Sequence, residues 1–243
     1  MTSRFPLVKI CSLREPAHAE FAVAAGADAI GLIFAEARRK VTMERAVEIV
    51  SELRRTQGSK DVVVVGVFVG QSADEINRIA DLVELDVAQL HGDESPELAA
   101  LVERPVIKAL RLAATDTAPG VASRVEAFDR LARPPLAYLV DPHSTDAPGG
   151  TGRRVDWTVA EEIARSTRMI LAGGLTPGNV GDAIRRVRPA GVDVSSGVET
   201  DGVKDRAKVI AFVHAARAAF STLDLDQGGV VPITEAAEPA DRP

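Results

Sequence analysis

Cysteine and aromatic residues are scarce in this chain of 243 residues, which has one Cys, one Trp and one Tyr and is only 4% aromatic. A single cysteine excludes a disulfide within the chain and a cysteine-rich zinc site, and we expect no bound metal. No apolar run reaches about 18 residues, and no apolar segment follows a basic start. The sequence therefore predicts neither a membrane span nor export, and it favours the cytoplasm.

An excess of one charge is also lacking. The 29 basic and 35 acidic residues are mixed along the chain and give a net charge of −6. This balance favours neither a nucleic acid nor an anionic membrane as a partner, because both attract a surplus of positive charge. An anionic ligand would have to be bound by a local site.

Aliphatic side chains are plentiful, since 46% of the residues are hydrophobic although few are aromatic. A core of Val, Leu, Ile and Ala suits a parallel sheet covered by helices. Short apolar segments typical of strands alternate with segments of helical periodicity, at an average repeat of about 27 residues, which is typical of a βα unit. The strand segments lie at 7–11, 28–34, 62–69, 86–90, 105–110, 136–141, 169–172 and 191–195, and helices are expected at 15–25, 42–56 and 121–131, among others.

This alternation predicts an α/β fold, a single-domain (β/α)8 TIM barrel over residues 1–220. An open, doubly wound sheet is the alternative, because its helices have the same pattern. The segment 221–243 contains glycines, prolines and acidic residues without periodicity. We expect it to be a poorly ordered C-terminal tail.

Glycines cluster where the last two predicted strands end. The strand at 169–172 runs into GGLTP (173–177), where Thr176 is the expected N-cap of the next helix, and the strand at 191–195 runs into Ser196 and Gly197. Backbone N–H groups of such turns can approach an oxyanion, and a helix N-terminus adds partial positive charge. One such turn alone would be an ordinary tight turn. Two in succession, after the last strands of a barrel, favour a phosphate site.

Five chemically useful side chains follow the ends of predicted strands: Cys11, Arg39, His91, Arg111 and Asp141. In a barrel these positions share the rim at which catalytic groups lie. Each has a simpler explanation, since a lone cysteine is often a small buried hydrophobe and an Asp at a strand end often caps a turn. Their common position favours a functional site.

The loop after Asp141 is long and ends in GGTG (149–152). Such a loop can fold over a ligand, exclude water and offer further N–H donors. His143 in this loop is a weaker competitor to Asp141 as a proton carrier.

Several motifs together resemble phosphoribosylanthranilate isomerase of tryptophan biosynthesis. The resemblance covers roughly residues 7 to 215. Its motifs are KIC (9–11), QLHG (89–92), the GGTG of the long loop, AGGLTPGNV (172–180) and VDVSSGVE (192–199). The order and spacing are those that a βα barrel demands.

The resemblance implies an Amadori rearrangement of N-(5-phosphoribosyl)anthranilate to 1-(2-carboxyphenylamino)-1-deoxyribulose 5-phosphate, without a cofactor. Asp141 matches the family's general acid and Cys11 its general base. Only a few per cent of an ordinary thiol, with a pKa of about 8.5, is ionised at neutral pH, so a cationic neighbour is expected. Lys9 lies on the same face of its strand as Cys11. Asp141 must hold a proton, which calls for burial or nearby negative charge.

The remaining expected site residues bind a small phosphorylated substrate. Arg39 matches the family arginine that faces the anthranilate carboxylate. The substrate-binding set is Lys9, Arg39, His91, Arg111 and Asp193. The phosphate-binding set is Gly149, Gly150, Thr151, Gly173, Gly174, Asn179, Ser195, Ser196 and Gly197. A monomer or a homodimer is expected.

Two departures from the family pattern concern the site. Ser12 stands where the family usually has Gly, and ARR (37–39) stands where it has SPR, in a loop one residue shorter. Two alternatives therefore stay open. One is a related phosphosugar isomerase, such as the barrel enzyme of histidine biosynthesis, although that family has Asp at the position of Cys11. The other is a non-catalytic phosphosugar-binding barrel, against which the presence of both Cys11 and Asp141 argues.

Overall fold

The computed structural model describes residues 7–56, 61–112, 115–142 and 157–226. Eight parallel strands close into a barrel in which each strand pairs with the next and β8 pairs with β1, so the predicted (β/α)8 TIM barrel is confirmed and the open sheet is excluded. The strands are β1 Leu7–Ile10, β2 Ala29–Ile33, β3 Val63–Phe68, β4 Val87–Leu90, β5 Val106–Leu112, β6 Ala137–Pro142, β7 Met169–Leu171 and β8 Gly191–Val194.

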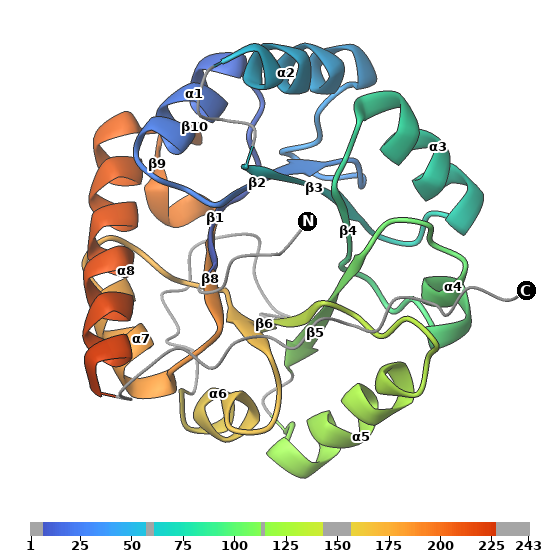
Figure 1. Cartoon of the computed structure of the whole chain (residues 1–243), viewed down its shortest axis with the longest axis vertical. Helices are drawn as coiled ribbons and strands as arrows, with labels where there is room; N and C mark the ends of the chain where they lie inside the picture. The colour runs from blue at the N-terminus through green and yellow to red at the C-terminus, as the bar shows by residue number, and fades with distance from the viewer. Residues whose placement is uncertain (1–6, 57–60, 113–114, 143–156, 227–243) are drawn as a thin grey trace, which may run out of the picture.

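Helices surround the barrel as an outer ring (Figure 1). They are α1 Pro16–Ala24, α2 Met43–Arg55, α3 Ala73–Val83, α4 Pro96–Ala100, α5 Ala118–Asp129, α6 Trp157–Ala164, α7 Val180–Val187 and α8 Arg206–Asp226. After β8 come a 3-10 turn, η1 Ser196–Val198, and a hairpin of two short strands, β9 Glu199–Thr200 and β10 Val203–Lys204.

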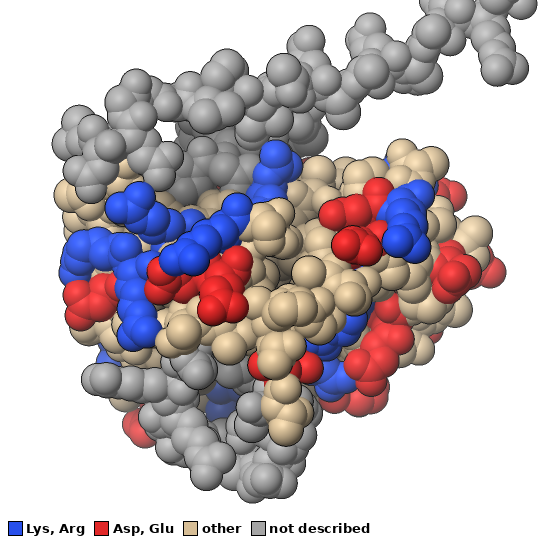
Figure 2. Space-filling view, turned by 90° about the horizontal axis from the view of Figure 1, so that it is seen from below, with Lys and Arg blue, Asp and Glu red and all other residues tan. Residues whose placement is uncertain are grey.

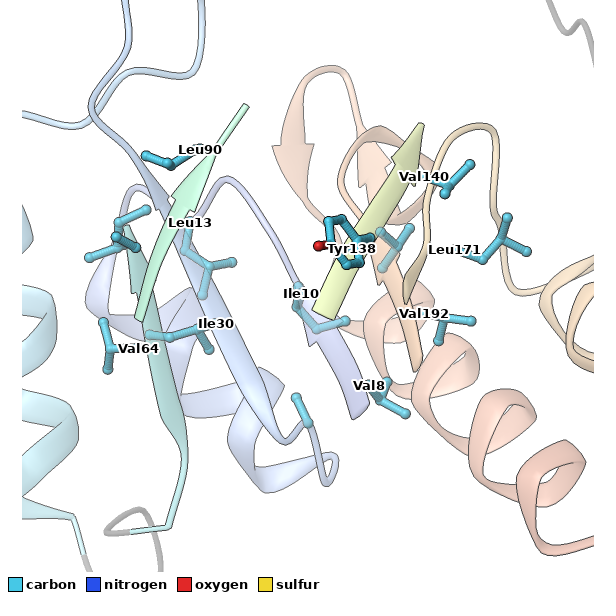
Figure 3. Packing of buried hydrophobic residues seen from close by; sticks show 14 of the residues in the cluster. Val8, Ile10, Leu13, Ile30, Val64, Leu90, Tyr138, Val140, Leu171 and Val192 are labelled. Carbon is cyan, nitrogen blue, oxygen red and sulfur yellow. The ribbon is translucent and has the colours of Figure 1, made fainter. Parts of the chain in front are cut away.

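The side chains on the two faces of each strand belong to two separate cores, because successive side chains point to opposite sides of a sheet. Figure 3 shows outward-facing side chains of the larger core, which packs between strands and helices, among them Val8, Ile10, Ile30, Val64, Val140, Leu171 and Val192. The smaller core fills the inside of the barrel with Leu7, Ala29, Val65, Val87, Ile107, Ala109, Ala137, Leu139, Ile170 and Ala172. Each fully buried aliphatic side chain contributes about 1.5–3 kcal/mol.

Polar caps set where several helices begin. Thr42, Ser72 and Ser95 each accept a hydrogen bond from the backbone N–H three residues later, at the starts of α2, α3 and α4. Such a cap contributes about 1 kcal/mol. Helix α5 begins at Ala118, earlier than the expected 121, because Thr117 caps it by accepting from the N–H of Gly120.

The expected N-cap at Thr176 was wrong, because helix α7 begins at Val180 and Asn179 occupies its N-cap position. The side chain of Asn179 accepts from the N–H of Thr176 at 2.7 Å and donates to the carbonyl of Gly174 at 3.0 Å. These two bonds hold residues 174–179 as a turn, so the helix starts only after it.

Helix α8 continues to Asp226, past the boundary expected at Phe220. Ala219 and Phe220 are buried in the core between barrel and helices. The rest of the expected tail, 227–243, lies outside the described residues.

The surface mixes charges of both signs, as the sequence predicted. On the face seen in Figure 2, Lys and Arg side chains lie next to Asp and Glu side chains. None of the helices in the described ranges is both long enough and apolar enough to span a bilayer.

Candidate active site

A cavity of about 750 Å³ opens at the carboxyl ends of the barrel strands. Among its lining residues are Cys11, Arg39, His91, Asp141 and Asp193, five of the predicted site residues. The remainder of its wall comes largely from the loops after β2 and β3. The sequence thus correctly placed the thiol after β1 and the carboxyl group of β6 at one site.

The period of two along the strands stacks the polar side chains in layers above the apolar interior. On β1, Leu7 belongs to the inner core, Lys9 comes next, and Cys11 follows at the mouth. On β4, Val87 belongs to that core and Gln89 and His91 line the cavity. Inward-facing positions near the carboxyl ends of the strands therefore carry the polar groups.

Lys9 is fully buried and pairs with Asp193, its neighbour across β1 and β8, at 2.9 Å between Nζ and Oδ1. Burial disfavours the ammonium, but the charge of Asp193 and the adjacent Cys11 more than offset this, so the pKa of Lys9 is raised above its ordinary value. The ammonium of Lys9 also lies close to the side chain of Cys11. The sequence expected a cationic neighbour for the thiol, and Lys9 is that neighbour.

Glycine at position 31 of β2 makes room for this cluster. A Cβ there would lie 2.7 Å from Sγ of Cys11 and 3.1 Å from Nζ of Lys9. Both distances are too short for an ordinary contact, so any side chain at Gly31 would displace the thiol or the ammonium.

His91 and Asp141 face each other across the mouth, with 3.9 Å between Nε2 and Oδ2. Burial, with a smaller contribution from the charge of Asp193, raises the pKa of Asp141 to about 6. Burial and the charge of Lys9 lower the pKa of His91 to about 4. At neutral pH the imidazole is therefore uncharged, while a fraction of the Asp141 carboxyl groups keep a proton.

Gln89 fixes the tautomer of that imidazole. Its side-chain Nε2 lies 2.9 Å from Nδ1 of His91. An amide N–H can only donate, so Nδ1 accepts and the proton of the neutral ring lies on Nε2, facing Asp141. The side-chain oxygen of Gln89 is buried and has no partner among the described residues.

Arg39 lines the cavity as predicted, but it is paired within the protein. Its Nε and Nη2 donate to the two carboxylate oxygens of Glu199 at 2.9 and 2.8 Å. Of the neighbouring cations, the guanidinium of Arg38 lies against Gly202, and Lys40, which also lines the cavity, pairs with Glu36. The ion pair of Arg39 with Glu199 joins this loop to the β9–β10 hairpin.

Arg111, a predicted substrate-binding residue, has its ion-pair partner outside the cavity. It stands next to Asp141 in the register of β5 and β6, yet its guanidinium pairs with Asp93 at 2.7 Å. It is not among the residues that line the cavity. A contact of Arg111 with substrate stays a prediction.

The two glycine-bearing turns lie against each other. Gly173 and Gly174 have φ of 79° and 60°, which favours glycine, and a Cβ at Gly197 would lie 1.8 Å from the carbonyl oxygen of Leu175. Ser195, between the turns and the thiol, lines the cavity. The roles of Gly173, Gly174, Asn179, Ser195, Ser196 and Gly197 in phosphate binding stay predictions, and Gly149, Gly150, Thr151 and His143 lie outside the described residues.

Comparison with known proteins decides the family. Residues 8–215 match the family model described as "N-(5'phosphoribosyl)anthranilate (PRA) isomerase". The chain belongs to the PRA isomerase family.

Relatives named as PRA isomerases share this sequence along nearly their whole length. The N-(5'-phosphoribosyl)anthranilate isomerase of Roseiflexus sp. (strain RS-1) is 46% identical over 215 residues, which cover 87% of this chain and 98% of that protein. The one from Dehalococcoides mccartyi is 39% identical over 206 residues, covering 85% and 93%. The chain is thus an isomerase of this family, and the resemblance found in the sequence is confirmed.

Solved structures of PRA isomerases share the fold. The enzyme from Thermotoga maritima superposes with a TM-score of 0.76 at 34% identity, covering 87% of this chain and 98% of that one. A PRA isomerase in complex with reduced 1-(o-carboxyphenylamino)-1-deoxyribulose 5-phosphate gives 0.73 at 32% identity and the same coverage. That neighbour therefore binds a small phosphorylated ligand.

Ser12 has a left-handed backbone with φ of 67°. A residue with a Cβ costs about 1–2 kcal/mol in this region, so glycine would suit the position better. Ser12 recovers part of this cost, because its hydroxyl hydrogen-bonds the hydroxyl of Ser195 at 2.7 Å.

We expect Ser12→Ala to be less stable than Ser12→Gly by about 1 kcal/mol or more, because both variants lose the hydroxyl but only Ala keeps the cost of a Cβ in the left-handed region. The midpoints of urea unfolding of the two variants and the parent chain measure this difference. Equal midpoints for Ala and Gly would show that the backbone at position 12 is not strained.

Some residues that shape the site escaped the sequence analysis. Glu94 and Lys108 form a buried ion pair at 2.9 Å, and Glu94 also accepts from the N–H groups of Gly70 and Gly92. This pair holds together the loops after β3 and β4, the second of which carries His91. The only signal for Gln89 was its place in QLHG, two residues before His91 and hence on the same face of β4.

Proposed function

We propose that the chain catalyses the Amadori rearrangement of N-(5'-phosphoribosyl)anthranilate to 1-(2-carboxyphenylamino)-1-deoxyribulose 5-phosphate in tryptophan biosynthesis, with Asp141 as general acid and Cys11 as general base. The observation that carries the assignment is that this carboxyl group and this thiol line one cavity in a member of the PRA isomerase family. The rearrangement moves protons within one molecule and has no net redox change, so it needs no cofactor.

The first step needs an acid, and Asp141 suits it. Its proton passes to the furanose ring oxygen of the substrate, the bond from that oxygen to C1′ breaks, and the nitrogen lone pair forms a protonated Schiff base. With a pKa raised to about 6, about a tenth of the Asp141 carboxyl groups carry a proton at pH 7, far more than for an ordinary Asp.

The second step needs a base, and Cys11 suits it as the thiolate. The thiolate takes the proton from C2′, and the electron pair of that C–H bond neutralises the iminium and leaves an enol amine. Protonation at C1′ and loss of the enol proton give the ketone. Lys9, which is fully buried and pairs with Asp193, is the cation beside Cys11.

The two ends of the substrate carry anionic groups. Arg39 faces the cavity and offers a guanidinium to the carboxylate of the anthranilate ring. The turns at Gly173–Gly174 and Ser195–Gly197 offer backbone N–H groups to the phosphate. The ligand of the solved PRA isomerase complex likewise carries a carboxyphenyl group and a 5-phosphate.

The decisive assay follows the fluorescence of the anthranilate group in freshly prepared substrate as purified protein is added. We expect the signal to decay in proportion to protein concentration. If the signal decays no faster than by spontaneous hydrolysis of the substrate, the alternative of a non-catalytic phosphosugar-binding barrel holds. If the protein converts only a different phosphoribosyl amine, it is an isomerase of altered substrate.

The cellular setting belongs to the same proposal. We place the enzyme in the cytoplasm as a monomer or homodimer, since a biosynthetic isomerase acts on dissolved metabolites. Light scattering coupled to size-exclusion chromatography measures the state, and a mass above that of two chains would contradict it.

The titration of Asp141 offers a check on the acid that does not depend on turnover. Carboxyl ¹³C NMR of the protein, with Asp141→Asn to assign the signal, should give a titration midpoint near pH 6. Well above that pH, the protonated fraction of Asp141 falls tenfold for each pH unit. In Asp193→Asn the midpoint should move to lower pH, because the negative charge of Asp193 helps to keep the proton on Asp141. A midpoint near 4 in the parent chain would rule out Asp141 as the acid.

A further inference from the structure

The β9–β10 hairpin carries two buried charged groups that the mechanism above leaves without a role. Glu199 opens β9 and Lys204 closes β10, and their side chains are 6% and 2% exposed. The carboxylate of Glu199 lies between two cations: Arg39 at 2.8 Å and Lys204 at 2.8 Å. A carboxylate that is shielded from water and paired twice in this way has a fixed position.

One edge of the Arg39 guanidinium is not used in the contact with Glu199. Glu199 takes the N–H of Nε and one N–H of Nη2. The opposite edge, formed by Nη1 and the second N–H of Nη2, has no acceptor among the described residues, and Arg39 borders the cavity. A two-nitrogen edge of this kind matches the two oxygens of a carboxylate.

Lys204 connects the ion pair of Arg39 and Glu199 to the segment that carries Ser195. Its Nζ donates to Glu199 at 2.8 Å and to the backbone carbonyl of Ser195 at 2.9 Å. Ser195 lines the cavity and directly precedes the turn with Ser196 and Gly197. One buried ammonium therefore spans the carboxylate that holds Arg39 and the backbone that leads into the expected phosphate turn.

We propose that Glu199 is a positioning residue that holds Arg39 by its Nε edge, so that the Nη1 edge meets the substrate's carboxylate, and that Lys204 couples this contact to the phosphate turn. The chemistry recognised is an aromatic carboxylate at one end and a phosphate monoester at the other. The inference rests on the proposed function for the identity of the substrate.

The first test separates the two ends with two probes, anthranilate and ribose 5-phosphate, whose binding is measured by calorimetry. Glu199→Gln keeps the shape of the side chain and removes its charge. We expect this variant to bind anthranilate at least about tenfold more weakly, because the guanidinium loses its charged partner. Ribose 5-phosphate should bind within about twofold of the parent, because Lys204, which loses the same partner, keeps its hydrogen bond to the carbonyl of Ser195. In turnover, KM should rise at least about tenfold and kcat change less than about threefold, since the reacting atoms are untouched.

Two results of that test would overturn the proposal. Unchanged affinity for anthranilate would mean that Glu199 does not position Arg39. Tighter binding of anthranilate would mean that Glu199 competes with the ligand for the guanidinium. Glu48→Gln, which removes the partner of Arg45 on the exposed face of α2, is the matched control and should change neither probe.

A double-mutant cycle distinguishes positioning from general loosening of the structure. In the Arg39→Ala background, Glu199→Gln should have no further effect on anthranilate binding, because there is no guanidinium left to position. An equal loss in both backgrounds would assign Glu199 a merely structural role. Thermal unfolding of each variant identifies any that fails to fold. If Glu199→Gln does not fold, Glu199→Asp, which keeps the charge on a shorter side chain, is tested in its place, and we expect the same loss of anthranilate affinity.

Lys204→Gln tests the coupling between the ends. It should weaken both anthranilate and ribose 5-phosphate, by at least about threefold each, since the ammonium bonds Glu199 and the Ser195 carbonyl at once. A loss confined to one probe would overturn the coupling. These binding measurements need no turnover, so failure of the parent chain to convert its substrate would refute the proposed function and leave this inference to be judged separately.

Discussion

Replacing Cys11 by Ala, or Asp141 by Asn, is expected to lower kcat by at least about two orders of magnitude and to leave KM nearly unchanged. Both groups line the cavity, and both act on protons that move only in the transition state. Cys11→Ser is the sharper variant at the first position, because a hydroxyl keeps the size of the thiol but is far harder to ionise. It should be as inactive as Cys11→Ala.

The measurement is the initial rate of anthranilate fluorescence decay at several substrate concentrations. Asp74→Asn, in the exposed first turn of α3, is the control for Asp141→Asn and should keep the parent rate. Normal turnover in Cys11→Ser would remove the thiol from the mechanism. Normal turnover in Asp141→Asn would do the same for the carboxyl group and would leave His91, its neighbour at 3.9 Å, as the group to examine.

Removing the ammonium of Lys9 is expected to have the largest effect on stability. Lys9→Met leaves Asp193, which is only 8% exposed, without its partner, and breaking a buried ion pair on one side costs about 3–5 kcal/mol. The double variant Lys9→Met/Asp193→Leu removes both charges and should regain most of that loss. It should nevertheless be inactive, because the cation beside the proposed base Cys11 is gone.

Urea unfolding followed by circular dichroism gives the free energy of each variant. The exposed pair of Arg185 and Asp182 supplies the control, and Arg185→Met should change stability by less than about 1 kcal/mol. A double variant no more stable than Lys9→Met would show that the cost comes from lost packing of the Lys9 stem rather than from an unpaired charge.

The fold could be predicted from the sequence because its main signals are local. Apolar segments such as 62–69 depend on neighbouring residues alone, and this one appears in the structure as β3. The N-cap of α7 failed for the opposite reason. Thr176 has the right chemistry, but the side chain of Asn179 bonds both the N–H of Thr176 and the carbonyl of Gly174, which forms a turn before the helix that the local pattern did not predict.

The site could be predicted where the order of the strands sets the positions of the residues. It could not be predicted where side chains from distant elements pair with one another. The ends of parallel strands share one rim, so Cys11 and Asp141 could be brought together from topology alone. The partner of Arg39 is 160 positions away in sequence, on a hairpin whose direction depends on tertiary packing. Charge pairs of that kind produce no periodic pattern in the sequence. For this reason the proposed role of Glu199 could be inferred only from the structure.

The apolar filling inside the barrel has a consequence for how reactant and product move. Leu7, Ile107, Leu139 and Ile170 occupy the interior below Lys9, so traffic through the amino-terminal end is blocked. Substrate and product of the proposed reaction therefore occupy the same cavity beside the loops after β2 and β3. We expect the product to inhibit competitively with respect to substrate, because each excludes the other from that cavity.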